Sequence, residues 1–197
     1  MEIELTLTTI KDIVLIIGSL TSTLFAIGTY NKWKKEHKGK LKYELCRNVL
    51  KTVYKIRDDY RSARSPVMFG HEMMPGYNPG ITKESENLLH VHNGRMKFLS
   101  ESCNNLHSLL PEIEIELNAE IKNFCNLLLI EIHHYQMKLS EYIQVVDNAK
   151  NLDKDYLKEI RLQIYDSSEN ASAKSFNDKV EKIKSEIAKE IKKYWAY

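Results

Sequence analysis

Cysteine is scarce in this chain, and its three positions form no ligand or disulfide pattern. Cys46, Cys103 and Cys125 are odd in number, widely spaced and contain no C-x-x-C motif. Zinc sites and disulfide frameworks need paired or closely spaced cysteines. Each cysteine also lies on or beside an apolar helix stripe, so we expect reduced, buried thiols in a reducing compartment.

The sequence also lacks the local signatures of most enzymes and nucleic-acid-binding proteins. Lysine and arginine number 29 against 27 acidic residues, and a net charge of +2 gives no global field for nucleic acid. We therefore expect no nucleic-acid partner. The chain holds no glycine-rich phosphate loop and no nucleophile motif. We assign no catalytic residue, no metal ligand and no cofactor, and the composition favours a non-enzymatic function.

Proline and glycine are few, and they gather in one place. Three of the four prolines and three of the seven glycines fall within residues 65–80, so this segment cannot be regular helix. Elsewhere apolar residues recur three and four positions apart, which predicts an all-α fold. We expect a loop over residues 65–81, either as an ordered connector or as a lid or partner surface.

One stretch of the chain, residues 13–31, contains no charged side chain. At about 1.5 Å per residue it covers a hydrocarbon core of roughly 30 Å, so we predict a single transmembrane helix. A cleaved signal peptide would need a basic start, whereas Glu2 and Glu4 stand at this end. A buried core helix is the other alternative.

Basic residues follow this span directly and predict its orientation. Lysine-rich flanks stay in the cytoplasm. We therefore place the chain in the plasma (inner) membrane, with residues 1–12 outside the cytoplasm and a cytoplasmic domain over 41–197. The basic juxtamembrane segment of 32–40 would contact the anionic inner leaflet, at about 1 kcal/mol per lysine, or would act only as a topology signal. The interfacial residues are Lys32, Trp33, Lys34, Lys35 and Lys38.

Small residues recur on one face of the span. Gly18, Ser22 and Ala26 are four positions apart and so share one side of a helix. Such a strip lets a second helix approach closely. We predict that the chain forms a homo-oligomer through this face.

The cytoplasmic domain should be a bundle of about five helices. The first runs over 41–63, and a long antiparallel hairpin occupies residues 82–147 with its turn at Pro111. We expect a buried His92, hydrogen-bonded to a neighbour such as Glu131. The hairpin seam has the heptad spacing of a coiled coil, and its residues are Leu89, His92, Met96, Leu99, Cys103, Leu106 and Leu110.

Two groups of polar residues are candidates for chemistry. Glu131 and His134 form an E-x-x-H pair, as in di-iron bundles, but the helical angle turns His134 outward, away from the core. Arg57, Arg61 and Arg64 lie at i, i+4 and i+7, and arginine presents a planar fork suited to phosphate or carboxylate. We predict these three arginines as the site of an anionic ligand. Charge neutralisation by nearby acids is the alternative.

These features together favour a single-pass, membrane-anchored helical protein that self-associates. It would act as a membrane effector or sensor, or present its domain to a cytoplasmic protein partner. The arrangement is typical of small bacterial single-pass proteins. The alternatives are a membrane-tethered enzyme, hydrolytic or metal-dependent, and a passive subunit of a larger membrane complex.

Overall fold

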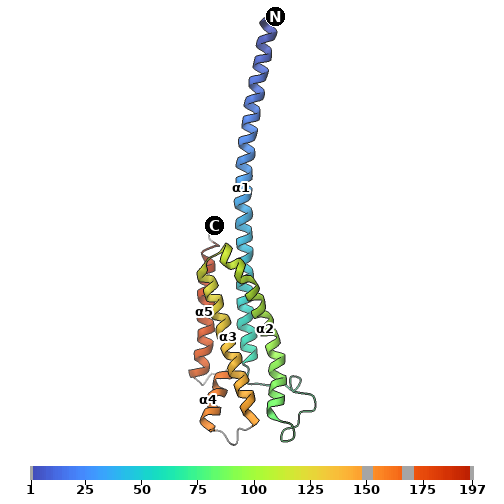
Figure 1. Ribbon diagram of the computed structural model, residues 1–197, viewed down its shortest axis with the longest axis vertical. Helices are drawn as coiled ribbons and strands as arrows, with labels where there is room; N and C mark the ends of the chain where they lie inside the picture. Colours follow the sequence, from blue (N-terminus) through green and yellow to red (C-terminus); the bar gives the residue numbers. More distant parts are fainter. Residues whose placement is uncertain (1, 148–152, 166–170, 196–197) are drawn as a thin grey trace. The chain divides into compact units, whose positions relative to one another are not determined.

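The protein is all-α, as predicted (Figure 1). The computed structural model describes the backbone of residues 2–147, 153–165 and 171–195, and the side chains of these residues except 2–10, 12 and 171–176. Five helices are present in this described part of the chain. The sequence predicted a membrane helix over 13–31 and a separate domain helix over 41–63. Both belong to one continuous helix.

That first helix, α1, runs over Glu2–Ala63 and belongs to two compact units, residues 1–44 and 45–197. In the first unit α1 is long and apolar enough to cross a membrane, and none of its most apolar 18-residue stretch is buried. Three of its hydroxyl side chains form hydrogen bonds within the helix: Ser19, Thr21 and Thr23 donate to backbone carbonyls one turn earlier, at 2.8–2.9 Å. Such internal bonds make hydroxyls tolerable in lipid.

The second unit is organised around α3 (Ala119–Val145). This helix contacts α2 (Glu84–Glu116), α4 (Lys154–Ile164) and α5 (Ala171–Lys192), and α4 also contacts α5 (Figure 1). The carboxyl-terminal part of α1 reaches α3 as well, because the Tyr135 hydroxyl donates to the Ala63 carbonyl at 3.0 Å. The α3 residues buried in the core are Ile121, Cys125, Leu128, Ile132, Tyr135, Leu139 and Tyr142.

The sequence predicted the turn of the helical hairpin at Pro111. In the structure the turn lies six residues later. Pro111 lies inside α2, which continues to Glu116. The chain reverses at Leu117 and Asn118, and the Asn118 side chain accepts a hydrogen bond of 2.8 Å from the Ile121 amide. An asparagine at this position is a preferred helix N-cap. The sequence interpretation missed it because proline suits both a helix start and, at a cost, a helix interior.

Most of the predicted seam of α2 is confirmed: His92, Leu99, Leu106 and Leu110 are buried, and Met96 and Cys103 pack partly buried against the core. Its first residue is the exception. Leu89 is 48% exposed, whereas Leu88 is 3% exposed. Two polar side chains occupy core positions that the apolar pattern passed over: Arg95 is 8% exposed, and Ser102 is buried and hydrogen-bonded to Asp59 of α1. Polar residues at core positions must find hydrogen-bond partners, and both do.

The position of the turn can be tested with two substitutions of opposite expected sign. Pro111→Ala supplies an amide that can donate to the carbonyl four residues earlier in α2. It should raise the free energy of unfolding by about 1–2 kcal/mol, even though the unfolded chain also becomes more flexible without the proline. Asn118→Ala removes the cap and should lower it by about 1 kcal/mol. Denaturant unfolding of the full chain in detergent, followed by circular dichroism, measures both. A destabilising Pro111→Ala would contradict the long α2.

Candidate functional site

The predicted arginine site is divided between the surface and the core. Arg57 pairs with its neighbour Asp58 at 2.7 Å and lies over the ring of Tyr54, 5.0 Å from its centroid. Arg61 reaches α5, where it pairs with Glu181 at 3.0 Å. A carboxylate thus already faces each of these two guanidinium groups. Anion binding by Arg57 and Arg61 stays a prediction.

Arg64 occupies a different environment, with no exposed surface at all. Its guanidinium donates to the Tyr60 hydroxyl at 2.6 Å and to the Tyr165 carbonyl at 3.5 Å. It also lies 5.2 Å from the ring centroid of Tyr60 and 5.9 Å from that of Tyr135. Aromatic faces attract a cation, and the effect is largest where water is excluded. Arg64 is therefore a core residue, and the three arginines share no open surface.

His92 is buried as predicted, but its partner is Tyr165 and not Glu131. Its Nε2 lies 3.3 Å from the Tyr165 hydroxyl. The predicted partner was wrong because it assumed a turn at Pro111. With the turn at 117–118, residues of α3 pair with different residues of α2, and Glu131 is no longer level with His92. Burial, aided by the positive charge of Arg95, lowers the pKa of His92 to about 4, so the imidazole is neutral at physiological pH.

Arg95 holds the proline- and glycine-rich loop, and the sequence interpretation did not single it out. Its guanidinium donates to both carboxylate oxygens of Glu72, at 2.9 and 2.8 Å. It also donates to the backbone carbonyls of Ser65 at 2.7 Å and Val67 at 2.6 Å. One planar fork therefore fixes both a side chain and the backbone at the loop entrance. Arg95 lies four positions after Val91 and four before Leu99, both of which are buried on α2. This spacing places Arg95 on the buried face, but a search for apolar residues alone passes over it.

Further along, the loop is ordered by turns and a second contact with α2. The Met74 amide donates to the Asn87 side chain at 2.9 Å. Gly76 and Gly80 adopt φ values of 79° and 90°, a backbone region open mainly to glycine. Yet Val67 and Phe69 are each 56% exposed. The loop is an anchored connector that carries apolar side chains on its outside.

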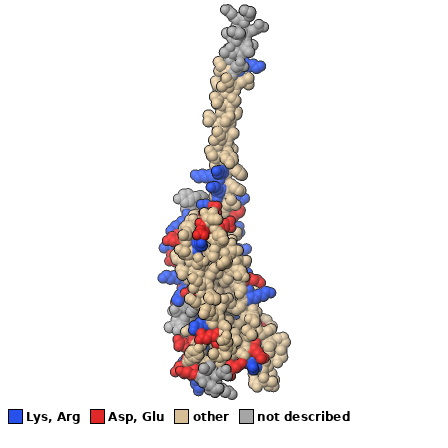
Figure 2. Space-filling view, in the orientation of Figure 1, with Lys and Arg blue, Asp and Glu red and all other residues tan. Residues whose placement is uncertain are grey.

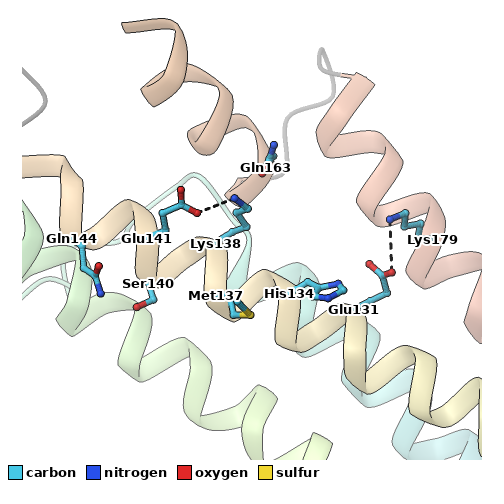
Figure 3. Close-up of a pocket in the computed structure, with 9 residues that line it drawn as sticks. All are labelled: Glu131, His134, Met137, Lys138, Ser140, Glu141, Gln144, Gln163 and Lys179. Carbon is cyan, nitrogen blue, oxygen red and sulfur yellow. Dashed lines mark hydrogen bonds and ion pairs between the residues drawn. The ribbon is translucent and has the colours of Figure 1, made fainter. Parts of the chain in front are cut away.

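A cavity of about 590 Å³ lies where α3 faces α4 and α5 (Figure 3). Glu131, His134, Lys138 and Glu141 come from α3, and Lys179 reaches toward Glu131 from α5 with a nitrogen–oxygen distance of 3.7 Å. Lys138 pairs with Glu141 at 2.8 Å. The formal charges of the two acids and two lysines sum to zero.

Both glutamates of this cavity have a lysine partner. Glu141 accepts hydrogen bonds from Lys138 and from the Tyr156 hydroxyl, the latter at 2.6 Å, and these bonds lower its pKa. Glu131 is paired with Lys179. The E-x-x-H histidine, His134, is exposed. Within the described residues, no group of three or more His, Cys, Asp or Glu side chains could hold a metal ion.

In the first unit, the residues of both predicted membrane features are exposed. Gly18, Ser22 and Ala26 carry no contacts that would explain their small size; a Cβ at Gly18 would meet no atom within 4 Å. After them, the Trp33 and His37 rings stack at a centroid distance of 5.3 Å. Figure 2 shows an uncharged stretch of this helix followed by a group of basic side chains. That group includes Lys32, Lys34, Lys35 and Lys38.

Comparison with known proteins adds no further constraint, because no protein-family model, curated protein or solved structure matches the chain. Its function must therefore be argued from its own residues.

The Arg95–Glu72 clamp predicts a specific pH dependence for the loop. The Arg95 hydrogen bonds, together with the Phe69 amide, hold the pKa of Glu72 at about 2, below its ordinary value of 4.5. Because the folded-state pKa is depressed, the stabilisation is complete above about pH 4.5 and is lost as the pH falls toward 2. Glu72→Gln should therefore weaken the loop at pH 7 and make little difference near pH 2.

Hydrogen–deuterium exchange of peptides from residues 65–83, corrected for intrinsic rates, measures this difference. Glu101→Gln, an exposed change on α2, serves as the matched control and should leave loop protection unchanged at every pH. Equal protection in Glu72→Gln and the natural chain at pH 7 would show that the clamp does not hold the loop.

Proposed function

We propose that this protein is a single-pass membrane protein whose second unit is a cytoplasmic, partner-binding helical domain. The observation that carries the proposal is the first unit: an uncharged helical stretch with its apolar side chains exposed, Ile13 at 50% and Phe25 at 78%, for example. A soluble protein rarely exposes a contiguous apolar surface of this kind. A hydrocarbon bilayer would cover it.

Charge on either side of this stretch supports the predicted orientation. The lysines of residues 32–40 are exposed, and Trp33 lies among them. Lysine at the cytoplasmic boundary and tryptophan at the interface are the usual anchors of a membrane helix. The domain that follows would then lie on the cytoplasmic side, where buried thiols such as Cys46 and Cys125 stay reduced.

This domain is suited to binding more than to catalysis. The acids and lysines that line the cavity between α3, α4 and α5 balance in charge, and the loop carries the exposed side chains of Val67 and Phe69. Apolar side chains that are held outward by an ordered backbone are typical of a protein contact. We infer a cytoplasmic protein partner that contacts this loop.

The orientation can be tested by labelling engineered cysteines in intact cells. A membrane-impermeant maleimide should label Thr8→Cys and should not label Lys35→Cys until the membrane is opened. The intact mass of the membrane-bound chain reports separately on cleavage. Labelling of Lys35→Cys in intact cells would reverse the topology, and a chain shortened by the first 20–30 residues would identify a signal sequence instead.

The small-residue face supports self-association within the membrane. Nothing in its own chain requires Gly18, Ser22 or Ala26 to be small, because the structure leaves space beside all three. A second copy of the helix would use that space for close backbone contact. We infer that the span forms a homo-oligomer through this face.

Crosslinking in detergent and in membranes should therefore respond to one helix face only. Gly18→Ile or Ser22→Ile should reduce the crosslinked dimer by about tenfold, which corresponds to about 1.4 kcal/mol. Gly28→Ile makes the same change about 120° away from the centre of the face and should have little effect. Equal loss in all three variants would show that the face is not specific, and no loss in any would remove it.

A further inference from the structure

A second cavity, of about 350 Å³, lies between the start of α2, the end of α3 and α4. Its apolar lining comes from Tyr142, Val146 and Leu157. Tyr142 and Val146 are buried, at 6% exposure each, so this part of the lining belongs to the core of the domain. This cavity lies entirely within the second unit and does not depend on the membrane assignment.

Three cations line the cavity from one side of α4. Lys154, Lys158 and Arg161 are spaced at i, i+4 and i+7, so they share one helix face. Within the described part of the chain, none of them lies within 4 Å of a carboxylate in an ion pair. The arginines of α1 with the same spacing differ here, since Arg57 and Arg61 both have acidic partners.

Glu84, in the first turn of α2, contributes a carboxylate to the cavity lining. Burial raises the pKa of Tyr142, while the Arg161 charge lowers it and the Glu84 charge raises it. Arg161 and Glu84 thus act on the same phenol. Three cations and one carboxylate leave a charge of +2 around a hollow with an apolar lining.

The backbone of α4 is fixed by contacts on a different face from the one that carries the cations. Ile160 and Ile164 are buried, at 3% and 0% exposure. The Asp153 side chain caps the first turn by accepting from the Asp155 amide at 3.0 Å. All three cations are exposed, and like charges one turn apart destabilise a helix slightly, so an anion bound among them would relieve this repulsion.

We propose that this cavity binds a phosphate monoester joined to an apolar or aromatic group, through Lys154, Lys158 and Arg161. A phosphate monoester carries a charge of about −1.5 to −2 near neutral pH, which matches the +2 of the lining. Arginine binds phosphate oxygens through its planar fork, and lysine does so as a point charge. The apolar lining would contact the rest of the ligand. A soluble nucleoside monophosphate and a phosphorylated lipid headgroup share this chemistry.

The test uses the full chain in phosphatidylcholine nanodiscs, titrated with AMP by calorimetry. Saturable binding is expected, and Lys154→Gln with Lys158→Gln should weaken it by at least tenfold. The matched control is Lys51→Gln with Lys55→Gln, which removes two exposed lysines at the same spacing on α1. That control should bind AMP as the natural chain does.

A second pair of variants makes the opposite prediction. Glu84→Gln removes the carboxylate from the cavity and should tighten AMP binding severalfold, whereas Glu86→Gln, in the same turn but outside the lining, should not. A variant that has merely lost its fold cannot bind more tightly. Tighter binding in Glu84→Gln alone would therefore support a specific site.

The source of the phosphate is separated by a third arm, in which phosphatidic acid replaces part of the nanodisc lipid. Competition by phosphatidic acid against AMP, lost in the Lys154/Lys158 variant, would support the lipid form of the site. AMP binding without such competition would support the soluble form. The proposal is overturned if neither probe binds, or if binding is unchanged by the Lys154/Lys158 variant, or if Glu84→Gln weakens it.

Discussion

The second unit depends on a buried positive charge that aromatic rings and hydroxyls accommodate. Arg64 has no exposed surface, and moving an uncompensated guanidinium out of water would cost several kcal/mol. Tyr60 compensates it with its hydroxyl and its ring, and Tyr135 adds a second ring. Tyr135 also donates to the Ala63 carbonyl at 3.0 Å, so the end of α1 and the middle of α3 are fixed to each other.

This fixed point determines where the loop starts and what holds it. The residue after Arg64 is Ser65, whose carbonyl is already a ligand of Arg95 on α2. The two buried arginines, Arg64 and Arg95, thus have different roles. Arg64 joins α1 to α3 and to the Tyr165 carbonyl, and Arg95 joins the loop to α2. These bonds hold the backbone at the loop entrance, where Met68 packs against the core while Val67 and Phe69 are exposed.

Hydrophobic periodicity was enough to predict the helices but not their register. The stripe of residues 45–63 is buried where the pattern placed it, from Cys46 to Ala63. The hairpin turn was misplaced because Pro111 and Asn118 are both plausible helix starts, and only packing distinguishes them. A shift of six residues in the turn changes every pair across the hairpin. The error in the partner of His92 followed directly from it.

The ion-pair partners of polar residues could not be predicted from the sequence either. Arg61 has a partner 120 positions away in sequence, Glu181, and nothing local to Arg61 reveals it. Spacing alone therefore could not separate Arg57, Arg61 and Arg64, which the fold supplies with partners, from Lys154, Lys158 and Arg161, which line a cavity without ion pairs inside the described residues. The i, i+4, i+7 rule detects both groups equally well. Only the packing of α5 against α1 and of α4 against α3 decides between them.

The cations on α4, which form no ion pairs within the described residues, affect the stability of that helix. A helix of 11 residues is marginal by itself, and a like-charged face weakens it further. Its order must come from the buried side chains of Ile160 and Ile164, and from Tyr165, which is 7% exposed and lies against Tyr142 and His92. The same tyrosine accepts from Arg64 through its carbonyl. Tyr165 therefore links the buried Arg64 to Tyr142, which lines the cavity beside α4. An anion bound by Lys154, Lys158 and Arg161 would reduce the repulsion along this face, and so would stabilise α4 and its packing in the core.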